Sequence, residues 1–103
     1  MGSPMRIRAK ESGGIVTVKV LMKHSMETGQ RKDSKGEKIP AHHITDVVAK
    51  NNNDEVFKAH FGPAVSKDPY LSFKYKGGSK GDTLSITWTD NKGDSRTDDT
   101  KVR

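Results

Sequence analysis

The side chains that could do acid–base or metal chemistry in this sequence are four histidines and several carboxylates, because the chain contains no cysteine. His42 and His43 are adjacent, and in a strand such neighbours point to opposite faces. His24 and His60 lie in separate segments, and neither a His-x-His nor a His-x-x-x-His spacing occurs. We therefore expect exposed or hydrogen-bonded histidines, no metal site and no cofactor.

The carboxylates lie mostly among turn-forming residues, where an Asp side chain commonly accepts hydrogen bonds from nearby backbone N–H groups. The sequence contains no G-x-S-x-G elbow, no phosphate-binding loop and no GxGxxG run. These patterns favour a binding or scaffolding protein over an enzyme, although a metal-dependent enzyme stays an alternative. The expected turn-capping residues are Asp33, Asp54, Asp68, Asp82, Asp90 and Asp94.

Length and composition limit the architecture to one small domain. Residues 1–4 resemble the remnant of an expression tag, which leaves residues 5–103 as a single domain. Hydrophobic residues make up 30% of the chain and charged residues 31%, so the core must be thin. No apolar run approaches the roughly 18 residues of a membrane span, and no signal peptide is recognisable, so we expect no membrane association.

The net charge of +6 raises the question of a nucleic-acid partner. Lys and Arg are spread along the chain, often at alternate positions between apolar residues, which is typical of the solvated face of a sheet. Tyr70 is the only aromatic residue on the polar phase of a predicted strand, so the stacking surface expected of a nucleic-acid binder is weak. We expect no nucleic acid, and a basic nucleic-acid-binding β domain stays an alternative.

Apolar residues alternate with polar ones in the segments 15–22, 55–61, 70–75 and 83–89. This period of two predicts half-buried strands, with Trp88 anchoring the core. Weaker strands are predicted over 5–9, 43–50 and 95–103, the last as a charged edge strand beside the Trp88 strand. About seven short strands separated by turn signals predict an all-β, antiparallel β-sandwich.

Residues 25–41 are polar and have no apolar period of their own. A loop of this length in a compact domain is uncommon unless it is functional or has its own structure. Asp33-Ser34-Lys35-Gly36 is a plausible turn, so we predict a projecting hairpin. A mobile surface loop stays the alternative.

Three motifs in order resemble the SoxZ family. They are H-x-M-E-T-G over residues 24–29, P-x-x-x-x-x-P-Y-L-S-F over 63–73, and T-W-T-D-N-x-G over 87–93. The resemblance extends over nearly the whole chain from Met5 onward. It implies an immunoglobulin-like antiparallel β-sandwich and a non-catalytic role.

In the SoxZ family the partner SoxY carries thiosulfate-derived sulfur on a cysteine in a C-terminal Gly-Gly-Cys-Gly-Gly arm. The resemblance therefore implies a SoxYZ heterodimer, in which this chain helps to present the arm and docks transiently with the other Sox enzymes. It also implies a periplasmic location, reached by co-export with a SoxY that bears a twin-arginine signal. Without SoxY, the vacant surface is expected to allow homo-oligomers. An immunoglobulin-like adhesion or interaction module stays an alternative.

Two segments are predicted to bind protein partners. The hairpin segment begins with the first motif and continues into four basic residues: Arg31, Lys32, Lys35 and Lys38. These would steer an acidic partner surface, and the alternative is that they lie close to an anionic thiosulfate or sulfonate group on the SoxY arm. The connection over residues 63–70 carries apolar residues with no clear core phase, so it would contribute to a heterodimer surface of roughly 800 Å² per partner. For Val65, plugging the end of the sandwich is the alternative. The candidate residues are His24, Met26, Glu27, Thr28, Gly29, Arg31, Lys32, Val65 and Tyr70.

Overall fold

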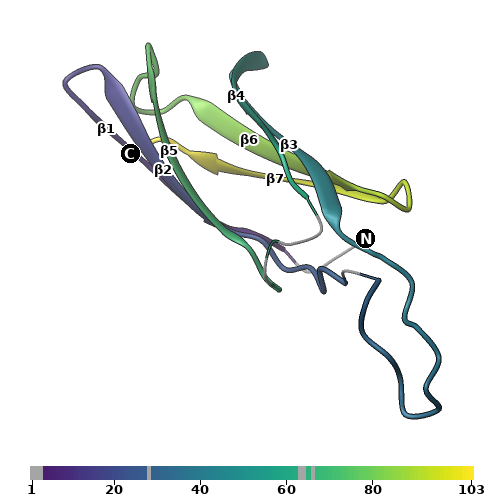
Figure 1. The fold of residues 1–103 in the computed structure, drawn as a ribbon. Coiled ribbons are helices and arrows are strands. Elements are labelled where there is room, and N and C mark those ends of the chain that lie inside the picture. The colour runs from purple at the N-terminus through teal and green to yellow at the C-terminus, as the bar shows by residue number, and fades with distance from the viewer. Residues whose placement is uncertain (1–3, 28, 63–64, 66) are drawn as a thin grey trace.

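The computed structural model describes residues 4–27, 29–62, 65 and 67–103. Its strands form two sheets that pack face to face (Figure 1). The three-stranded sheet has the order β1-β2-β5, with bounds β1 (Arg6–Ser12), β2 (Ile15–Leu21) and β5 (Tyr70–Lys76). The four-stranded sheet has the order β4-β3-β6-β7, with bounds β4 (Asp54–His60), β3 (Ile44–Asn51), β6 (Thr83–Asp90) and β7 (Ser95–Lys101).

All strand pairs are antiparallel, which confirms the predicted all-β sandwich. The described residues form seven strands and no α-helix. The segment 43–50, one of the weaker predicted strands, corresponds to strand β3. In the part of the chain that the structure describes, there is no helix long and apolar enough to cross a bilayer.

The core lies between the sheets and is built from every second residue. In β2, Val16 and Val18 are fully buried, while Lys19 beside them is exposed. In β6, Trp88 is only 1% exposed, which confirms its predicted place in the core. Burying a valine side chain completely contributes roughly 1.5 kcal/mol or more, so β2 and β6 supply much of the stability.

Strand β5 connects the two sheets through its inner residues. The rings of Phe73 on β5 and Phe57 on β4 stack with centroids 4.1 Å apart. The Tyr75 hydroxyl donates a hydrogen bond of 2.8 Å to Asn51 Oδ1 at the end of β3. Tyr75 is therefore a core residue, as its phase predicted.

Strand β7 is the edge strand predicted beside β6, and its inward positions are polar. Arg96 and Asp98 form an ion pair there, with Arg96 Nε 2.8 Å from Asp98 Oδ2. The same oxygen accepts a hydrogen bond of 3.0 Å from the backbone N–H of Met5. These contacts satisfy the polar groups at the seam where β7 approaches the start of β1.

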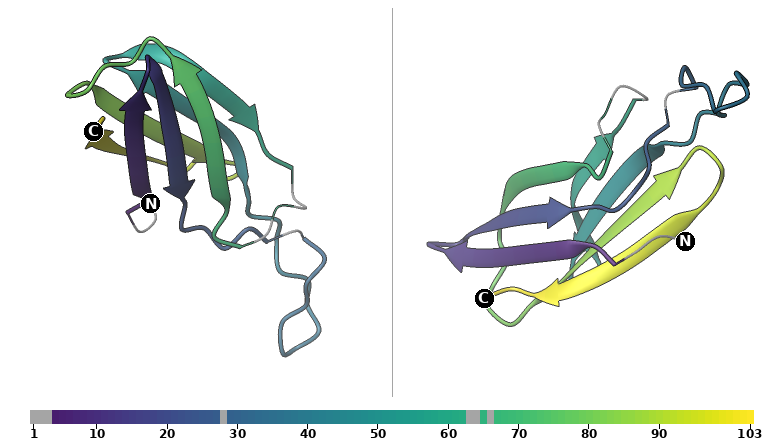
Figure 2. Two further views of the ribbon diagram at one scale, coloured as in Figure 1. Left: turned by 90° about the vertical axis from the view of Figure 1, so that its left-hand side faces the viewer. Right: turned by 90° about the horizontal axis from the view of Figure 1, so that it is seen from below.

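The segment between β2 and β3 forms the predicted projecting hairpin (Figures 1 and 2). Backbone N–H groups of Asp33 and Ile39 donate to the carbonyls of Glu37 and Arg31, at 2.8 Å in both cases. The Asp33 carboxylate accepts the N–H groups of Lys35 and Glu37, so it caps the turn as expected. The hairpin gives the molecule an elongated shape, with extents of 54 × 19 × 19 Å.

Candidate functional site: the hairpin and its buried base

His24, His42 and Asp90 converge at the base of the hairpin. His24 Nε2 lies 3.1 Å from Asp90 Oδ2, and His42 Nε2 lies 2.7 Å from the same oxygen. The Asp90 side chain has no exposed surface and that of His24 is 4% exposed. The His24 ring meets the rings of His42 and Trp88 edge-on. We call the three polar residues His24, His42 and Asp90 the base cluster.

Asp90 also closes the turn between β6 and β7. Its second carboxylate oxygen, Oδ1, accepts hydrogen bonds from the N–H groups of Lys92 and Asp94, at 3.0 and 2.9 Å. Burial opposes ionisation of this carboxyl, but the hydrogen bonds from His24, His42 and the Lys92 N–H outweigh burial and lower the pKa of Asp90. Asp90 is thus an ionised acceptor for two rings and two backbone groups.

The base cluster offers three potential metal-ligand atoms within 4.8 Å of one another. The position of the His24 proton argues against such a use. His24 Nδ1 accepts the backbone N–H of Met26 at 3.1 Å, so the neutral ring carries its proton on Nε2 and donates it to Asp90. A metal on Nε2 would require the proton on Nδ1, where it would oppose the Met26 N–H. The arrangement therefore suits a hydrogen-bonded cluster and not a metal centre.

Met26 turns the chain at the start of the hairpin. Its φ of 52° lies in the left-handed region, which residues other than glycine adopt rarely. Its side chain is buried, and its sulfur accepts the N–H of Ile44 at 3.3 Å. Hydrogen bonds to His24 and Ile44 thus hold a conformation that the Met26 backbone would not favour alone.

The two strands of the hairpin pair just above the base cluster. Glu27 and His42 exchange two backbone hydrogen bonds, of 2.7 and 2.9 Å. Gly29 has a φ of 87°, and a Cβ atom placed there would lie 3.3 Å from Ala41 Cβ. Glycine is therefore favoured at position 29 both by the backbone angle and by the close approach of the opposite strand. Thr28 lies outside the described residues.

Arg31 makes a bidentate ion pair with Glu27, with distances of 2.9 Å from Nε to Oε1 and 2.7 Å from Nη2 to Oε2. This hydrogen bonding to Arg31 is the main reason that the pKa of the Glu27 carboxyl is lowered. The Arg31 side chain is still 64% exposed. Lys32 is exposed as well, and it makes no ion pair with any residue that the structure describes.

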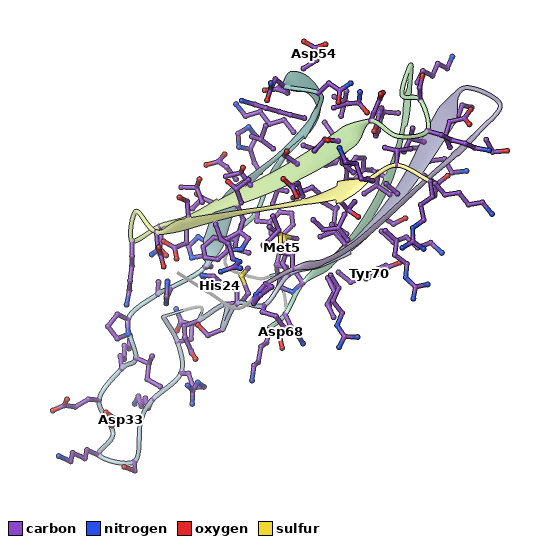
Figure 3. All side chains as sticks on the ribbon, turned by 180° about the vertical axis from the view of Figure 1, so that it is seen from behind. Met5, His24, Asp33, Asp54, Asp68 and Tyr70 are labelled. Atoms are coloured by element: carbon purple, nitrogen blue, oxygen red, sulfur yellow. The ribbon has the colours of Figure 1, made fainter. Side chains whose placement is uncertain are left out.

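The connection to β5 is attached to the same base. The His24 N–H donates to Asp68 Oδ1 at 3.0 Å, and the Asp68 N–H donates to the His24 carbonyl at 2.9 Å. Tyr70, two residues later, is 62% exposed. Val65 is partly buried and packs against the core, as expected of a residue that plugs the end of the sandwich. Figure 3 shows His24 and Asp68 near each other and Asp33 at the distant tip of the hairpin.

Sequence reasoning did not find the base cluster. Asp90 lies 66 positions from His24 and 48 from His42, so no local spacing signals their contact. The only sequence signal is positional: both histidines flank the long polar segment, and Asp90 ends a predicted strand. The structure brings His24, Met26, Glu27, Gly29 and Arg31 together at or near the hairpin base, whereas Val65 lies on the connection to β5 and Tyr70 is the first residue of β5.

A family model described as Sulphur oxidation protein SoxZ matches residues 5–101, nearly the whole chain. The chain belongs to the SoxZ family. No curated protein matches the chain. Membership makes this SoxZ chain a sulfur oxidation protein of the periplasmic Sox system, in a family of generally non-catalytic carrier subunits.

The first motif of the resemblance has a structural explanation in this SoxZ chain. His24 supplies one ring of the base cluster, Met26 makes the left-handed turn, and Gly29 permits the close approach of Ala41. The motif therefore specifies how the hairpin leaves the sandwich.

Proposed function

We propose that this chain is the non-catalytic subunit of a SoxYZ heterodimer. It binds SoxY and helps to present the cysteine arm of SoxY to the other Sox enzymes. The observation that carries this proposal is the family match over residues 5–101. The composition supports it, because a thioconjugate needs a thiol and none of the 103 residues is a cysteine. The sulfur cargo therefore belongs on the partner.

The hairpin is the element of this chain best suited to guide docking. Its base is fixed by the base cluster, and the hairpin that carries its basic residues projects away from the sandwich. His24 and Met26 are buried and act by positioning the hairpin. Arg31 and Lys32 are exposed and steer an acidic partner surface.

The permanent contact with SoxY requires a larger and more apolar surface than the hairpin offers. We place this contact at the start of β5, because Tyr70 is one of two large hydrophobic residues that are exposed among the residues that the structure describes. A tyrosine supplies a large contact area at a small cost in conformational entropy. Val65 packs inward against the core, so its part is to support the connection. Assembly with SoxY also accounts for a periplasmic location, reached by export together with SoxY.

Co-purification tests the proposed heterodimer. The tagged chain is expressed in its native host during growth on thiosulfate, and periplasmic partners are identified by mass spectrometry. We expect one stoichiometric partner that ends in Gly-Gly-Cys-Gly-Gly. Recovery of nucleic acid, or of the chain alone, would overturn the proposal.

A charge reversal tests steering by the hairpin. Arg31→Glu with Lys32→Glu is expected to slow association with SoxY or with a docking Sox enzyme at least several-fold at low salt. The matched control is Lys50→Glu with Lys58→Glu, which changes the charge equally on β3 and β4. Equal rates for the two double variants would reject the steering role.

A further inference from the structure

The outward face of the three-stranded sheet is made of twelve residues that the strand register places in four rows. Six are cations and none is a carboxylate. We call this surface the basic face. Its cations are Arg6, Arg8, Lys10, Lys19, Lys74 and Lys76, and its other residues are Ser12, Ile15, Thr17, Leu21, Tyr70 and Ser72. Figure 2 (left) shows the sheet of β1, β2 and β5 from this side.

None of the six cations makes an ion pair or a side-chain hydrogen bond with any described residue, and all six are exposed. The nearest carboxylate in β1, Glu11, lies on the opposite phase and accepts the Gly14 N–H at 2.7 Å. The chain has 19 Lys and Arg residues and 13 Asp and Glu residues. Outside the basic face, 13 cations therefore balance 13 carboxylates, so the whole net charge of +6 corresponds to this one face.

A groove of about 920 Å³ follows β1 along the border of the basic face. Its lining includes five cations and no Asp or Glu side chain: Arg8, Lys10, Lys19, Lys101 and Arg103. Backbone hydrogen bonds to β1 hold Arg103 at one side of the groove. The Arg103 N–H donates to the Ala9 carbonyl at 3.0 Å, and the Arg103 main-chain oxygen accepts the Glu11 N–H at 2.7 Å. The groove is thus preformed and electropositive.

We propose that the basic face is a transient docking surface for the Sox enzymes that act on the carrier. The docking enzyme presents an acidic surface to the face, and an acidic protrusion of this surface enters the groove along β1. This inference rests on the proposed function, which supplies the identity of those enzymes. The charge of the face is complementary to such a partner, and concentrated charge of one sign raises association rates at low salt.

The composition of the basic face separates this use from three others. A permanent interface with SoxY would resemble a divided core, but half of these twelve positions carry charge, and burying them would need matching counter-charges. Tyr70, the SoxY contact proposed above, belongs to an end row of the face, so the SoxY interface borders the face and leaves the rows of Arg8, Lys19 and Lys74 exposed. A single-stranded nucleic acid would need aromatic platforms, and Tyr70 is the only aromatic residue on the face. A second copy of this chain would bring like charges together.

The test uses the assembled SoxYZ complex. Arg8→Glu, Lys19→Glu and Lys74→Glu are combined, and the matched control combines Lys50→Glu, Lys58→Glu and Lys80→Glu, which are exposed and lie outside the face. Binding is measured against each purified Sox enzyme that attaches, oxidises or hydrolyses the cargo. For at least one enzyme, we expect the face variant to associate at least tenfold more slowly than the control at low salt, with a flatter salt dependence.

Three results would overturn the proposal: equal association rates for the two variants with every enzyme, loss of SoxY binding only in the face variant, or salt-sensitive binding of a labelled DNA oligonucleotide that only the face variant loses. If unaltered chain and SoxY do not assemble, the proposed function itself fails, which is a separate outcome. The neutral variant Arg8→Gln, Lys19→Gln and Lys74→Gln guards against misfolding, and it should show a smaller change in the same direction.

Discussion

The base cluster and the basic face use polar residues in opposite ways. At the base, Asp90 is buried and accepts hydrogen bonds from two histidine rings and two backbone groups. On the face, six cations have no partner among the described residues. The paired polar groups contribute to the fold, whereas unpaired exposed charges contribute little to stability and remain available for binding.

The outer face of the four-stranded sheet strengthens this contrast. It carries charges of both signs: His60 Nδ1 lies 2.6 Å from Asp46 Oδ1, and Lys50 is opposite Glu55 in the strand register. Two outward sheet faces of one small domain thus differ in charge balance, although both obey the same alternation of apolar and polar residues. Alternation alone decides which residues face solvent, and the signs of their charges decide what the face can bind.

Removing the shared acceptor of the base cluster should have the largest effect. Asp90→Ala leaves two ring N–H groups and two backbone N–H groups without their acceptor, and we expect a loss of about 3 kcal/mol or more in the free energy of unfolding. Chemical denaturation measures this. The control Asp99→Ala removes an exposed carboxylate from β7 and should change stability by about 0.5 kcal/mol or less. Similar losses in both variants would show that burial and shared hydrogen bonding give Asp90 no special weight in the fold.

Acid should weaken the base cluster before it affects the basic face. The pKa of Asp90 is lowered in the folded state from its ordinary value of 3.8. A lowered carboxyl pKa stabilises the fold at pH values above the unfolded pKa, and this stabilisation is lost as the pH falls through the folded pKa. Unfolding free energies measured between pH 6 and about pH 2 should fall mainly below about pH 4. Asp90→Asn should reduce this slope, and an unchanged slope would argue against the ionised acceptor.

The position of a glycine in the hairpin should determine the cost of replacing it. Gly29→Ala places a Cβ 3.3 Å from Ala41 at a φ of 87°, and a loss of roughly 1–2 kcal/mol is expected. Gly36 has a similar φ of 81°, but nothing lies within 4 Å of the position that an added Cβ would take, so Gly36→Ala should cost less. Thermal or chemical unfolding compares the two variants. A larger loss at position 36 would contradict the close packing of the hairpin base.

Neutralising the basic face should have the smallest effect on stability. Arg8→Gln with Lys19→Gln relieves repulsion between like charges and breaks no ion pair, so stability should stay equal or rise by a few tenths of a kcal/mol at low salt. Lys50→Gln with Lys58→Gln removes charges that face Glu55 and Asp46, and a decrease of similar size is expected. Chemical denaturation at two salt concentrations shows whether each double variant gains or loses stability. A clear loss of stability in the face variant would contradict the idea that the cations of the basic face contribute little to the fold.

The sequence was sufficient for the sandwich because the apolar period of two survives in every core strand. It also placed Trp88 and Tyr75 in the core, and it placed the hairpin turn at Asp33. It could not reveal the base cluster, because the contact of His24 with Asp90 depends on how two sheets bring distant strand ends together. It could not reveal the basic face either. The six cations come from three strands, and only the pairing and register of β1, β2 and β5 show that they lie on one surface.

The most direct test of the account is the intact mass of the complex that this chain forms in cells grown on thiosulfate. We expect one copy of this chain with one copy of SoxY, and a sulfur adduct on the cysteine of SoxY only. This chain should keep the mass of its sequence, since it has no thiol. A sulfur adduct on this chain, or recovery of the chain without SoxY, would contradict its role as the supporting subunit of the carrier.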